Sequence, residues 1–382
     1  MVTRIISDNG IPREKVRYAV VGLGYIAQAA VLPAFAHARE NSELTALISD
    51  DALKLRKLGK KYRVENLYTY EEYWVALRSG EFDAVYIALP NSMHAEYSID
   101  ALREGIHVLC EKPMAVTSQE CRAMIGAARA AGRKLMIAYR LHFEEANMEA
   151  VRIAQSGKLG DLRFFTSTFS MNVKPGDIRL QAELGGGPLN DIGIYCINAA
   201  RYLFCDEPEE VTAVAVSCDD RRFREVPEMV AATMRFPKDR VATFLCGFNA
   251  GDVSEYRVVG ERGSLLVEPA YELAEALGHT LTIGDKTREC AFSRRDQFAP
   301  ELVHFSECIR HNLDPSPSGE EGLADMLIIE ALNESIQTQR PVKVKAIEPP
   351  SRPGPALEMR KRPVRKPKLI AVTPPSKKRS DS

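Results

Sequence analysis

The feature that most constrains the fold of this chain is a glycine-containing turn near its amino terminus. The apolar run VRYAVV at 16–21 is followed by G-x-G-x-x-A and then by a helical pattern, so the motif lies between a strand and a helix. The first glycine permits a tight turn, the second lets the backbone approach a pyrophosphate, and the alanine permits close helix packing. The free N–H groups at the start of the helix favour an anion. In this context the motif predicts dinucleotide binding rather than an ordinary glycine turn, through the residues Gly22, Leu23, Gly24, Tyr25, Ile26 and Ala27.

Strands and helices alternate through the first part of the chain. After the glycine turn, the apolar segments ELTALIS, DAVYIALP, HVLCE and KLMIAYR are separated by helical patterns. Unbroken apolar strands in such an alternation are typical of a parallel sheet that helices cover on both faces. We therefore predict an α/β fold in which residues 16–140 form a doubly wound, Rossmann dinucleotide-binding domain.

The pattern changes after residue 141. Segments between 163 and 268 alternate apolar and polar residues, and short links containing glycine, aspartate or proline join them. This spacing favours an open, mostly antiparallel sheet. Helical patterns at 301–312 and 322–339 are expected to close the same unit. We predict a C-terminal α+β domain at 141–347 that serves in substrate binding and oligomerisation.

Both ends of the 382-residue chain lie outside these two domains. Residues 1–15 form a short arm, and residues 348–382 contain ten Lys or Arg, three acids and eight of the 22 prolines. The net charge of -1 therefore hides a basic tail attached to an acidic main part. Because the tail has no apolar periodicity, we predict that it is disordered.

The composition excludes several kinds of site. The eight cysteines include no C-x-x-C pair, and no two histidines have the H-x-x-x-H spacing of metal ligands. We expect buried free thiols and no metal site. No run approaches the ~18 apolar residues that a membrane span needs, and the first residues contain no apolar signal region. These features predict a cytoplasmic protein without a membrane partner.

The end of the second predicted strand bears on the choice between NADP and NAD. An acidic side chain at this place bonds the ribose 2′-hydroxyl of NAD and repels the 2′-phosphate of NADP. Ser49 ends the strand, Asp50 and Asp51 follow it, and Lys54 lies one turn later. Ser49 and Lys54 suit a phosphate whereas Asp50 does not, so we expect NADP, with NAD as the alternative.

Two later strands end in polar residues that should face the nicotinamide half of the cofactor. In a doubly wound sheet, ligands lie beyond the carboxyl ends of the strands. A lysine in such a cleft can polarise a substrate hydroxyl, although a surface lysine after a strand is the alternative. The residues concerned are Leu89, Pro90, Asn91, His94, Glu111 and Lys112.

Several motifs together resemble one family of enzymes. G-x-G-x-x-A, L-P-N-S-x-H at 89–94 and E-K-P at 111–113 are similar to the Gfo/Idh/MocA family of nicotinamide-dependent sugar and polyol oxidoreductases. The segment GGGPLNDIGIYCINAARYLF at 185–204 resembles the family segment that returns a helix of the second domain to the nicotinamide. Its form here is similar to that of the glucose-fructose oxidoreductases. The resemblance extends over about residues 16–345.

This resemblance implies hydride transfer between a sugar C1 hydroxyl, which becomes a lactone, and the nicotinamide of NADP or NAD. It assigns Tyr195 as the proton acceptor and Lys112 as the electrostatic support of its phenolate. Asp191, one helical turn earlier, would bond a substrate hydroxyl or Lys112. Arg140 and Arg179 are expected near the cofactor, with a surface salt bridge as the alternative for Arg179, and Tyr139 and His142 are expected on the substrate side.

Two functions remain open at this point. The first is an oxidoreductase of a sugar or polyol, with a cofactor that either exchanges or is retained, because the short arm and the tail depart from the family pattern. The second is a nicotinamide-binding regulator without turnover, whose basic tail engages a polyanion. The presence of both Lys112 and Tyr195 favours the enzyme.

The partners follow from the expected fold. The tail lacks the interleaved aromatic residues of a nucleic-acid site, so we expect no nucleic acid. An open sheet with an apolar outer face usually has a partner. We predict a homodimer or homotetramer through this sheet, with Phe244, Leu245 and Phe248 on the face that is covered.

Overall fold

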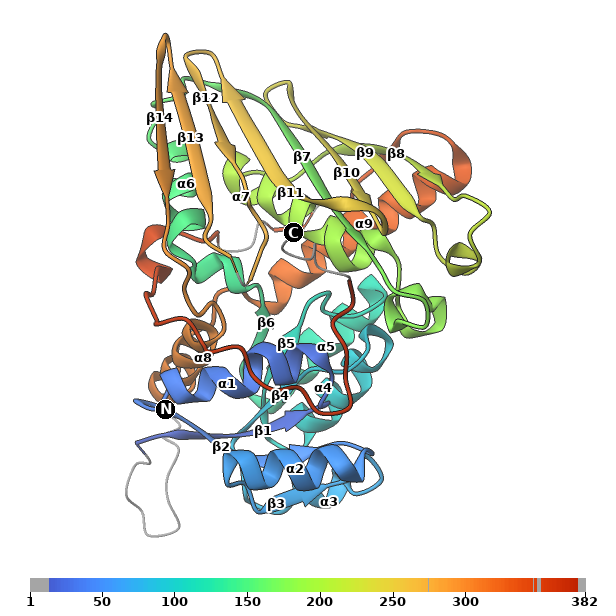
Figure 1. Ribbon diagram of the computed structural model, residues 1–382, viewed down its shortest axis with the longest axis vertical. Coiled ribbons are helices and arrows are strands. Elements are labelled where there is room, and N and C mark those ends of the chain that lie inside the picture. Colours follow the sequence, from blue (N-terminus) through green and yellow to red (C-terminus); the bar gives the residue numbers. More distant parts are fainter. Residues whose placement is uncertain (1–13, 274, 346, 349–351, 377–382) are drawn as a thin grey trace.

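The computed structural model describes residues 14–273, 275–345, 347–348 and 352–376. Residues 1–13, which make up most of the expected arm, lie outside this range. Two sheets dominate the described part, one in each half of the chain (Figure 1). The α/β fold with a Rossmann sheet followed by a second, mostly antiparallel sheet is confirmed.

The first sheet is parallel and has the strand order β3-β2-β1-β4-β5-β6. Strands β1, β4, β5 and β6 contain apolar residues on both faces and are almost completely buried, as helices on both sides require. Helix α5 begins at a capping box formed by Thr117 and Glu120 and ends at Gly132, which has a positive φ. The sequence prediction lacked β3 and α3. The strands are β1 (Val16–Val21), β2 (Ser42–Ile48), β3 (Asn66–Tyr68), β4 (Ala84–Ile87), β5 (His107–Glu111) and β6 (Leu135–Ala138), and the helices between them are η1 (Ala27–Val31), α1 (Leu32–Ala34), η2 (Phe35–His37), α2 (Ala52–Tyr62), α3 (Tyr73–Leu77), η3 (Asn91–Met93), α4 (His94–Arg103) and α5 (Ser118–Ala131).

The second sheet has the order β14-β13-β12-β11-β7-β10-β9-β8-β15. Its neighbours are antiparallel except for β7 and β10, which pair in parallel. The sequence prediction lacked β13, the exposed edge strand β14 and the two-residue strand β15. The strands are β7 (Leu162–Asn172), β8 (Glu210–Val216), β9 (Met229–Phe236), β10 (Arg240–Gly247), β11 (Asn249–Gly260), β12 (Gly263–Val267), β13 (Gly278–Ile283), β14 (Lys286–Ala291) and β15 (Val342–Lys343).

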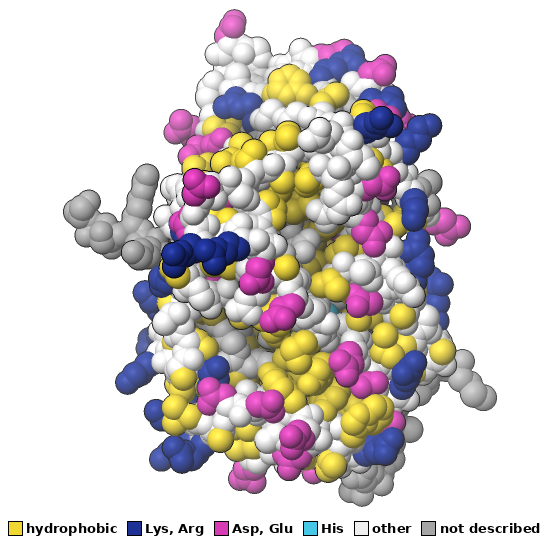
Figure 2. Space-filling model, turned by 90° about the vertical axis from the view of Figure 1, so that its right-hand side faces the viewer, with side chains coloured by type: hydrophobic (Ala, Val, Ile, Leu, Met, Phe, Trp, Pro, Cys, Tyr) yellow, Lys and Arg dark blue, Asp and Glu magenta, His cyan; other side chains and the backbone are white. Residues whose placement is uncertain are grey.

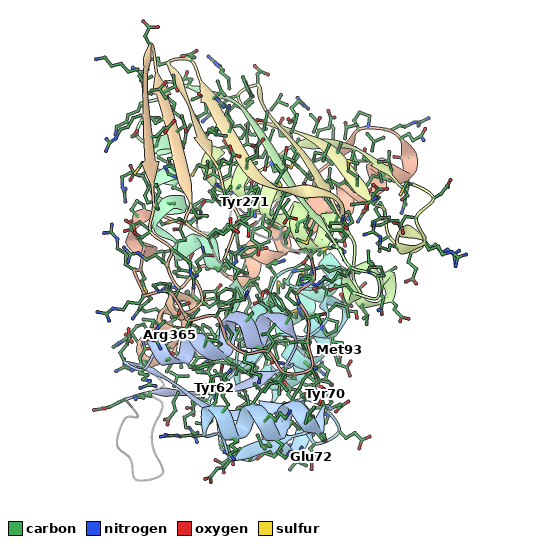
Figure 3. The ribbon with its side chains drawn as sticks, in the orientation of Figure 1. Tyr62, Tyr70, Glu72, Met93, Tyr271 and Arg365 are labelled. Atoms are coloured by element: carbon green, nitrogen blue, oxygen red, sulfur yellow. The ribbon has the colours of Figure 1, made fainter. Side chains whose placement is uncertain are left out.

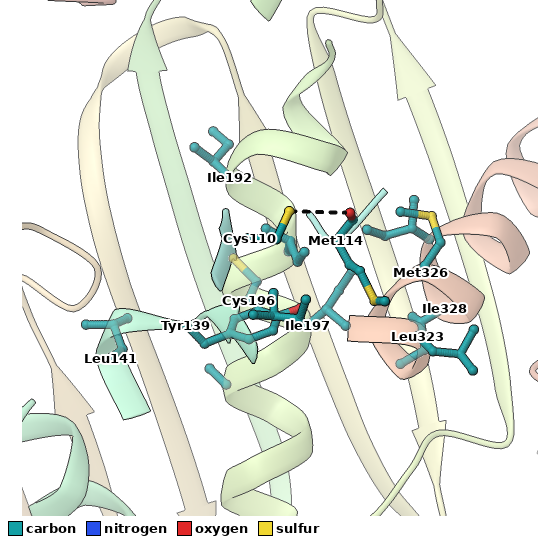
Figure 4. Close-up of a cluster of buried hydrophobic side chains, with 14 of the residues drawn as sticks. Cys110, Met114, Tyr139, Leu141, Ile192, Cys196, Ile197, Leu323, Met326 and Ile328 are labelled. Carbon is teal, nitrogen blue, oxygen red and sulfur yellow. Dashed lines mark hydrogen bonds between the residues drawn. The ribbon is translucent and has the colours of Figure 1, made fainter. Parts of the chain in front are cut away.

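Helices α6 (Glu145–Gln155), α7 (Ile194–Phe204) and α9 (Gly319–Thr338) lie on the inner side of the second sheet. Side chains of α7 and α9 pack against the end of β5 and the loop after it, in one apolar cluster that joins both halves of the molecule (Figure 4). In this cluster Ile197 and Met326 lie close to Cys110 and Met114. The segment before α7 is thereby fixed against the loop that carries Lys112.

Helix α8 (Ala299–His311) corrects the expected division of the chain. It does not close the second domain as its position in the sequence suggested, because it packs against β1 and β2 of the first sheet. The Ser306 hydroxyl is hydrogen bonded to the Tyr18 hydroxyl and to Ser42, each at 2.8 Å, and Leu302 is fully buried. The first sheet is therefore covered on one side by a helix from the second half of the chain.

The outer face of the second sheet also differs from the expectation. Phe244 and Phe248 are 3% and 0% exposed. Phe244 belongs to the alternate residues of β10 that point toward the helices, and Phe248 follows directly after the strand. Leu245 alone of the three expected residues lies on the outer face, beside Thr168 and Ala231. This face is formed mainly by threonine and small apolar side chains, with Phe164, Val214, Val216 and Val241 exposed on its strands.

The described part of the tail differs from the disordered segment that we predicted at 348–382, of which residues 349–351 and 377–382 lie outside the described range. Residues 352–376 are described, and they run along the surface of the molecule, crossing in front of α1 before they rise toward the second sheet (Figure 1). Met359 N–H donates to the Phe143 carbonyl at 3.1 Å, and Lys361 pairs with Asp296 through its backbone. Backbone hydrogen bonds hold this segment, and such bonds leave no periodic pattern in the sequence.

The cysteine prediction was partly wrong. All eight cysteines are free thiols, but Cys205, Cys218 and Cys290 are exposed. They lie at a helix end, in a loop and on an edge strand respectively. Within the described ranges, no helix is long and apolar enough to cross a membrane, and no cluster of His, Cys, Asp and Glu side chains is arranged to hold a metal ion.

Candidate active site

A cleft of ≈ 1180 Å³ lies between the two sheets and brings together nearly all residues expected from the sequence. Tyr271 reaches it from the segment after β12, and Tyr70 reaches it from the lower part of the first domain (Figure 3). Of the predicted residues, Ala27 does not line the cleft because it is fully buried behind the glycine turn, and Tyr139 and His142 also lie outside it. The predicted residues that line it are Gly22, Leu23, Gly24, Tyr25, Ile26, Ser49, Lys54, Leu89, Pro90, Asn91, His94, Glu111, Lys112, Arg140, Arg179, Asp191 and Tyr195.

The glycine turn has the geometry that a dinucleotide requires. Gly22 has a φ of +92°, and a Cβ atom there would lie 2.4 Å from the Ala88 carbonyl oxygen. Around Gly24, by contrast, a Cβ atom would meet no other atom within 4 Å, so the backbone is open toward the cleft. The first turn of the following helix provides free N–H groups. Together with the volume of the cleft, this open cradle fits a nicotinamide dinucleotide.

At the predicted adenosine end, the acidic side chains are turned away from the cleft. Asp50 accepts a hydrogen bond from the Tyr70 N–H at 2.8 Å, and Asp51 caps α2 through the N–H groups of Leu53 and Lys54. These bonds lower the pKa of Asp51 against a small effect of burial. Ser49 and Lys54 line the cleft, whereas Asp50 does not. The surface offered to the ribose thus carries a hydroxyl and an ammonium group.

Lys112 and Arg179 converge on Asp191 in the middle of the cleft. Lys112 Nζ donates to the Asp191 carbonyl at 2.7 Å and lies 3.4 Å from its Oδ1, while Arg179 Nε donates to Oδ2 at 2.7 Å. Burial acts to raise the pKa of Asp191, but the charges of Arg179 and Lys112 outweigh it and hold this pKa below its usual value. Asp191 is therefore an anion that fixes both cations.

The glycine run before Asp191 positions Arg179. Gly187 N–H donates to the Arg179 carbonyl at 2.8 Å, and a Cβ atom on Gly186 would lie 2.4 Å from the same oxygen. Only glycine permits this approach, which holds Arg179 opposite Asp191. Burial opposes the charge of Arg179, yet Asp191 and Asp177 raise its pKa above the usual value. The surface salt bridge considered for Arg179 is thus an ion pair inside the cleft.

Tyr195 lies between two cations. Lys112 Nζ is 4.8 Å from the centre of its ring, and Arg140 Nη2 donates to its hydroxyl at 3.3 Å. Arg140 is 5% exposed, and it also donates to the Tyr271 carbonyl at 2.6 Å and to Gln297 Oε1. Lys112 therefore contacts the face of Tyr195, while Arg140 contacts its hydroxyl oxygen.

The remaining predicted residues around the nicotinamide end are held by hydrogen bonds to neighbouring segments. Both ring nitrogens of His94 lie close to backbone carbonyls, of Pro113 at 2.8 Å and of Leu89 at 3.0 Å. Asn91 donates to the Gly185 carbonyl at 2.8 Å and so links the two halves of the cleft. Glu111 accepts a hydrogen bond from the Tyr86 hydroxyl at 2.8 Å, and burial raises its pKa despite the nearby Lys112.

Tyr139 and His142 do not line the main cleft as expected. They lie behind Tyr195 in a buried polar network, where the Tyr139 hydroxyl donates to Asp325 at 2.6 Å and His142 Nε2 lies 2.7 Å from Asn198 Oδ1. Burial lowers the pKa of His142 to about 4 and raises that of Asp325 to about 6. Their side chains support α7 rather than contact a ligand in the cleft.

Sequence reasoning missed several residues of the cleft. Arg140 was predicted at the site, but its contact with the Tyr195 hydroxyl, 55 positions away, was not, and neither was Gln297, which holds Arg140 from behind the cleft. The aromatic wall of Phe169 and Tyr271 packs around Tyr195, with ring centroids 5.7 and 5.8 Å away. Phe169 lies on the buried side of β7, and the alternation of a strand does not indicate which ligand such a residue meets. The tail residues Lys366, Pro374, Pro375 and Ser376 also line the cleft.

Two family models match the chain. The model described as "Oxidoreductase family, NAD-binding Rossmann fold" matches residues 16–139, and the GFO/IDH/MocA C-terminal domain matches residues 148–266. The first match spans the parallel sheet and the second spans most of the antiparallel one.

Curated relatives and solved structures agree with these matches. The D-xylose 1-dehydrogenase [NADP(+)] of Haloarcula marismortui is 32% identical over 337 residues, which cover 86% of this chain and 93% of the relative. The aldose-aldose oxidoreductase from Caulobacter crescentus, complexed with glycerol, is 37% identical with a TM-score of 0.82 and covers 86% of this chain and 99% of its own. A 3-ketoreductase from Actinomadura kijaniata, in complex with NADP and TDP-benzene, is 28% identical with a TM-score of 0.77 and covers 84% and 98%. The chain belongs to the GFO/IDH/MocA family and is a nicotinamide-dinucleotide-dependent oxidoreductase.

Proposed function

We propose that the protein is an NADP-dependent sugar oxidoreductase that oxidises the C1 hydroxyl of an aldose to a lactone. The observation that carries this proposal is the Tyr195 hydroxyl, which lies in the cleft with Arg140 at 3.3 Å and with Lys112 against its ring. A phenol held between two cations is suited to accept a proton from a sugar hydroxyl. Similarity to a xylose dehydrogenase and to an aldose-aldose oxidoreductase supports the choice of a sugar.

Several residues of the chain have separate roles in the proposed reaction. When bound, NADP supplies the acceptor for the hydride that leaves the sugar carbon. Tyr195 accepts the hydroxyl proton, and the charges of Arg140 and Lys112 stabilise the phenolate that forms. Asp191 keeps Lys112 in place and, with Arg179, offers polar groups to the sugar hydroxyls. In the reverse direction the same Tyr195 returns a proton to the carbonyl oxygen.

The choice of NADP rests on the adenosine end of the cleft. Ser49 and Lys54 line it, and Asp50 is engaged by the backbone of Tyr70. The acid that would repel a 2′-phosphate is thus turned away. Ser49, Lys54, the glycine turn and the residues 89–91 would hold the cofactor.

The alternative of a regulator with a polyanion-binding tail has less support. Several basic residues of the described tail are neutralised within the chain, since Arg352 pairs with Glu207, Lys361 with Glu40 and Arg360 with Glu145. On the face shown in Figure 2, acidic and basic side chains are interspersed rather than gathered by sign. Part of the positive charge of the described tail is thus engaged within the chain, which leaves less of it for nucleic acid.

Oxidation of a panel of aldoses and polyols with NADP and with NAD, followed by the absorbance of the reduced nicotinamide, tests the proposal. We expect turnover of at least one aldose with NADP, and formation of its lactone. If the protein binds NADP but oxidises no sugar or polyol, the proposed function is wrong.

Two further properties belong to the same proposal. The outer face of the second sheet, with Phe164, Val214 and Val216 exposed, supports a homodimer or homotetramer through this face. A monomeric mass in light scattering would contradict it. We also propose a cytoplasmic location, which cell fractionation with a periplasmic marker protein tests.

A further inference from the structure

The tail passes over the opening of the cleft. Lys366, Pro374, Pro375 and Ser376 line the same cavity as the glycine turn, although more than 300 positions separate them from it. Figure 1 shows this last segment crossing in front of α1, which continues the helix of the glycine turn. In Figure 3 Arg365, just before Lys366, lies beside the same helix.

One side chain ties the tail to the glycine turn. Gln28 is 1% exposed and lies in η1, directly after the G-x-G-x-x-A motif. Its Oε1 accepts from the Ile370 N–H at 2.8 Å, and its Nε2 donates to the Ile370 carbonyl at 3.0 Å and to the Leu23 carbonyl at 2.9 Å. The same amide therefore contacts the backbone of the tail and the backbone of the turn that would hold the pyrophosphate.

A second anchor lies on the other side of the opening. Lys174 N–H donates to the Pro375 carbonyl at 3.0 Å, and Lys174 Nζ donates to the Pro374 carbonyl at 3.0 Å. Val173 and Ser376 form an antiparallel bridge next to them. Lys174 follows β7 of the second sheet, so the tail is attached to the first domain at 370 and to the second domain at 374–376.

The charge of Lys366 is available to a ligand. Among the other cations that line the cleft, Lys54 pairs with Asp51, and both Lys112 and Arg179 pair with Asp191. The Arg140 guanidinium is held by Tyr195, Tyr271 and Gln297. Lys366 is exposed at the opening and forms no ion pair with any residue that the structure describes. An ammonium group in this position suits the phosphates of a dinucleotide.

We propose that residues 362–376 are part of the nucleotide site, which they cover, and that Lys366 contacts a phosphate of the bound nucleotide. The identity of the ligand as NADP rests on the proposed function. Because the segment is held on both sides of the opening, a bound nucleotide leaves only after the tail detaches from Gln28 or from Lys174. The bound nucleotide in turn stabilises the attached tail, since coupling between two binding events is reciprocal.

The release rate of NADPH, measured by its fluorescence in the absence of sugar, tests the proposal. A chain that ends at Lys361 keeps the contacts of Arg352, Met359 and Lys361 but lacks the segment over the cleft. We expect NADPH to leave this chain at least about tenfold faster than it leaves the full chain, because the lost hydrogen bonds must break before release. Equal rates, or tighter binding by the shortened chain, would overturn the proposal.

Point variants separate this effect from a general loss of structure. Ile370→Pro removes the N–H that donates to Gln28, and Lys366→Ala removes the charge at the opening; each should accelerate release several-fold. Lys368→Ala is the matched control, because Lys368 is exposed on the same segment and does not line the cleft. If Lys368→Ala accelerates release as much as Lys366→Ala does, the assignment of Lys366 is wrong.

Limited digestion with trypsin gives a second measurement. Arg365 and Lys368 are exposed and are not followed by proline, so they are accessible cleavage sites in the segment. Saturating NADP should slow cleavage at both sites, whereas cleavage unaffected by NADP would contradict the proposal. These release and digestion measurements do not require turnover. If the shortened chain releases NADPH faster but the protein oxidises no sugar, the inference about the tail stands and the proposed function is wrong.

Discussion

Arg140 donates a hydrogen bond to the hydroxyl of Tyr195, although the two residues belong to different domains. The guanidinium is fixed by the Tyr271 carbonyl and by Gln297, so it does not depend on a ligand for its position. The site thus holds a fixed positive charge at the oxygen that we propose accepts the proton. Lys112, which the motif emphasised, contacts the ring of Tyr195 and the Asp191 carboxylate instead.

Arg140→Gln tests this arrangement through the rate of catalysis. The variant loses a charge-assisted hydrogen bond to the oxygen on which we expect negative charge to develop, so kcat/KM should fall by roughly 10- to 100-fold. Arg140→Lys, which keeps the charge, should lose less. An unchanged kcat/KM in Arg140→Gln would show that the hydrogen bond has no part in proton transfer.

Tyr195→Phe removes the proposed proton acceptor and keeps the ring. We expect kcat to fall by about 10²–10⁴-fold, the usual contribution of a general base, while the dissociation constant of NADPH stays the same. Tyr62→Phe is a suitable control, because Tyr62 ends α2 and does not line the cleft. Activity of Tyr195→Phe close to that of the wild type would exclude Tyr195 as the base.

Lys54→Ala tests the preference for NADP. A charge-assisted hydrogen bond to the 2′-phosphate is worth about 1.5–3 kcal/mol, so the dissociation constant of NADP should rise by roughly 10- to 100-fold. NAD lacks this phosphate, and its affinity should change little. Lys57→Ala, on the exposed side of the same helix, serves as control. Equal weakening of NADP and NAD would remove Lys54 from the 2′-phosphate site.

Asp325 gives the fold a pH dependence of its own. Burial raises its pKa to about 6, so the folded protein binds a proton that the unfolded chain releases near pH 4. The free energy of unfolding should therefore fall by roughly 2–3 kcal/mol as the pH rises from about 4 to about 6. In Asp325→Asn this decrease should disappear from chemical denaturation curves, whereas in Glu334→Gln, an exposed acid on the same helix, it should remain. A decrease of the same size in Asp325→Asn would assign it to other groups.

Local patterns predicted the parts of the molecule that depend on neighbours in sequence. The strand, glycine turn and helix around Gly22 follow from residue types within a few positions, and they predicted both the parallel sheet and its ligand. Arg140 was assigned to the cofactor, and its bond to Tyr195 was missed because it depends on how two domains meet. Phe244 and Leu245 show the same limit, since alternation separates the two faces of a strand without telling which face is covered.

Apolar periodicity was likewise insufficient to predict how the last part of the chain packs. The helix containing Leu302 has an apolar face, but its sequence does not specify which sheet it packs on. The tail is held by hydrogen bonds from Gln28 and Lys174 to its backbone rather than by an apolar face. Because every residue carries the same backbone groups, such contacts leave no pattern in the sequence.

The placement of α8 on the first sheet means that the nucleotide-binding domain cannot be transplanted as a continuous piece. A fragment that ends at residue 140 would expose Tyr18 and Val20, which α8 covers with Leu302 and Phe305 in the whole chain. Chimeras between members of the family that join one parent's first domain to another's second domain should therefore carry residues 299–311 with the first parent. The interchangeable module of this protein is defined by contact in space and is encoded by two separate stretches of sequence.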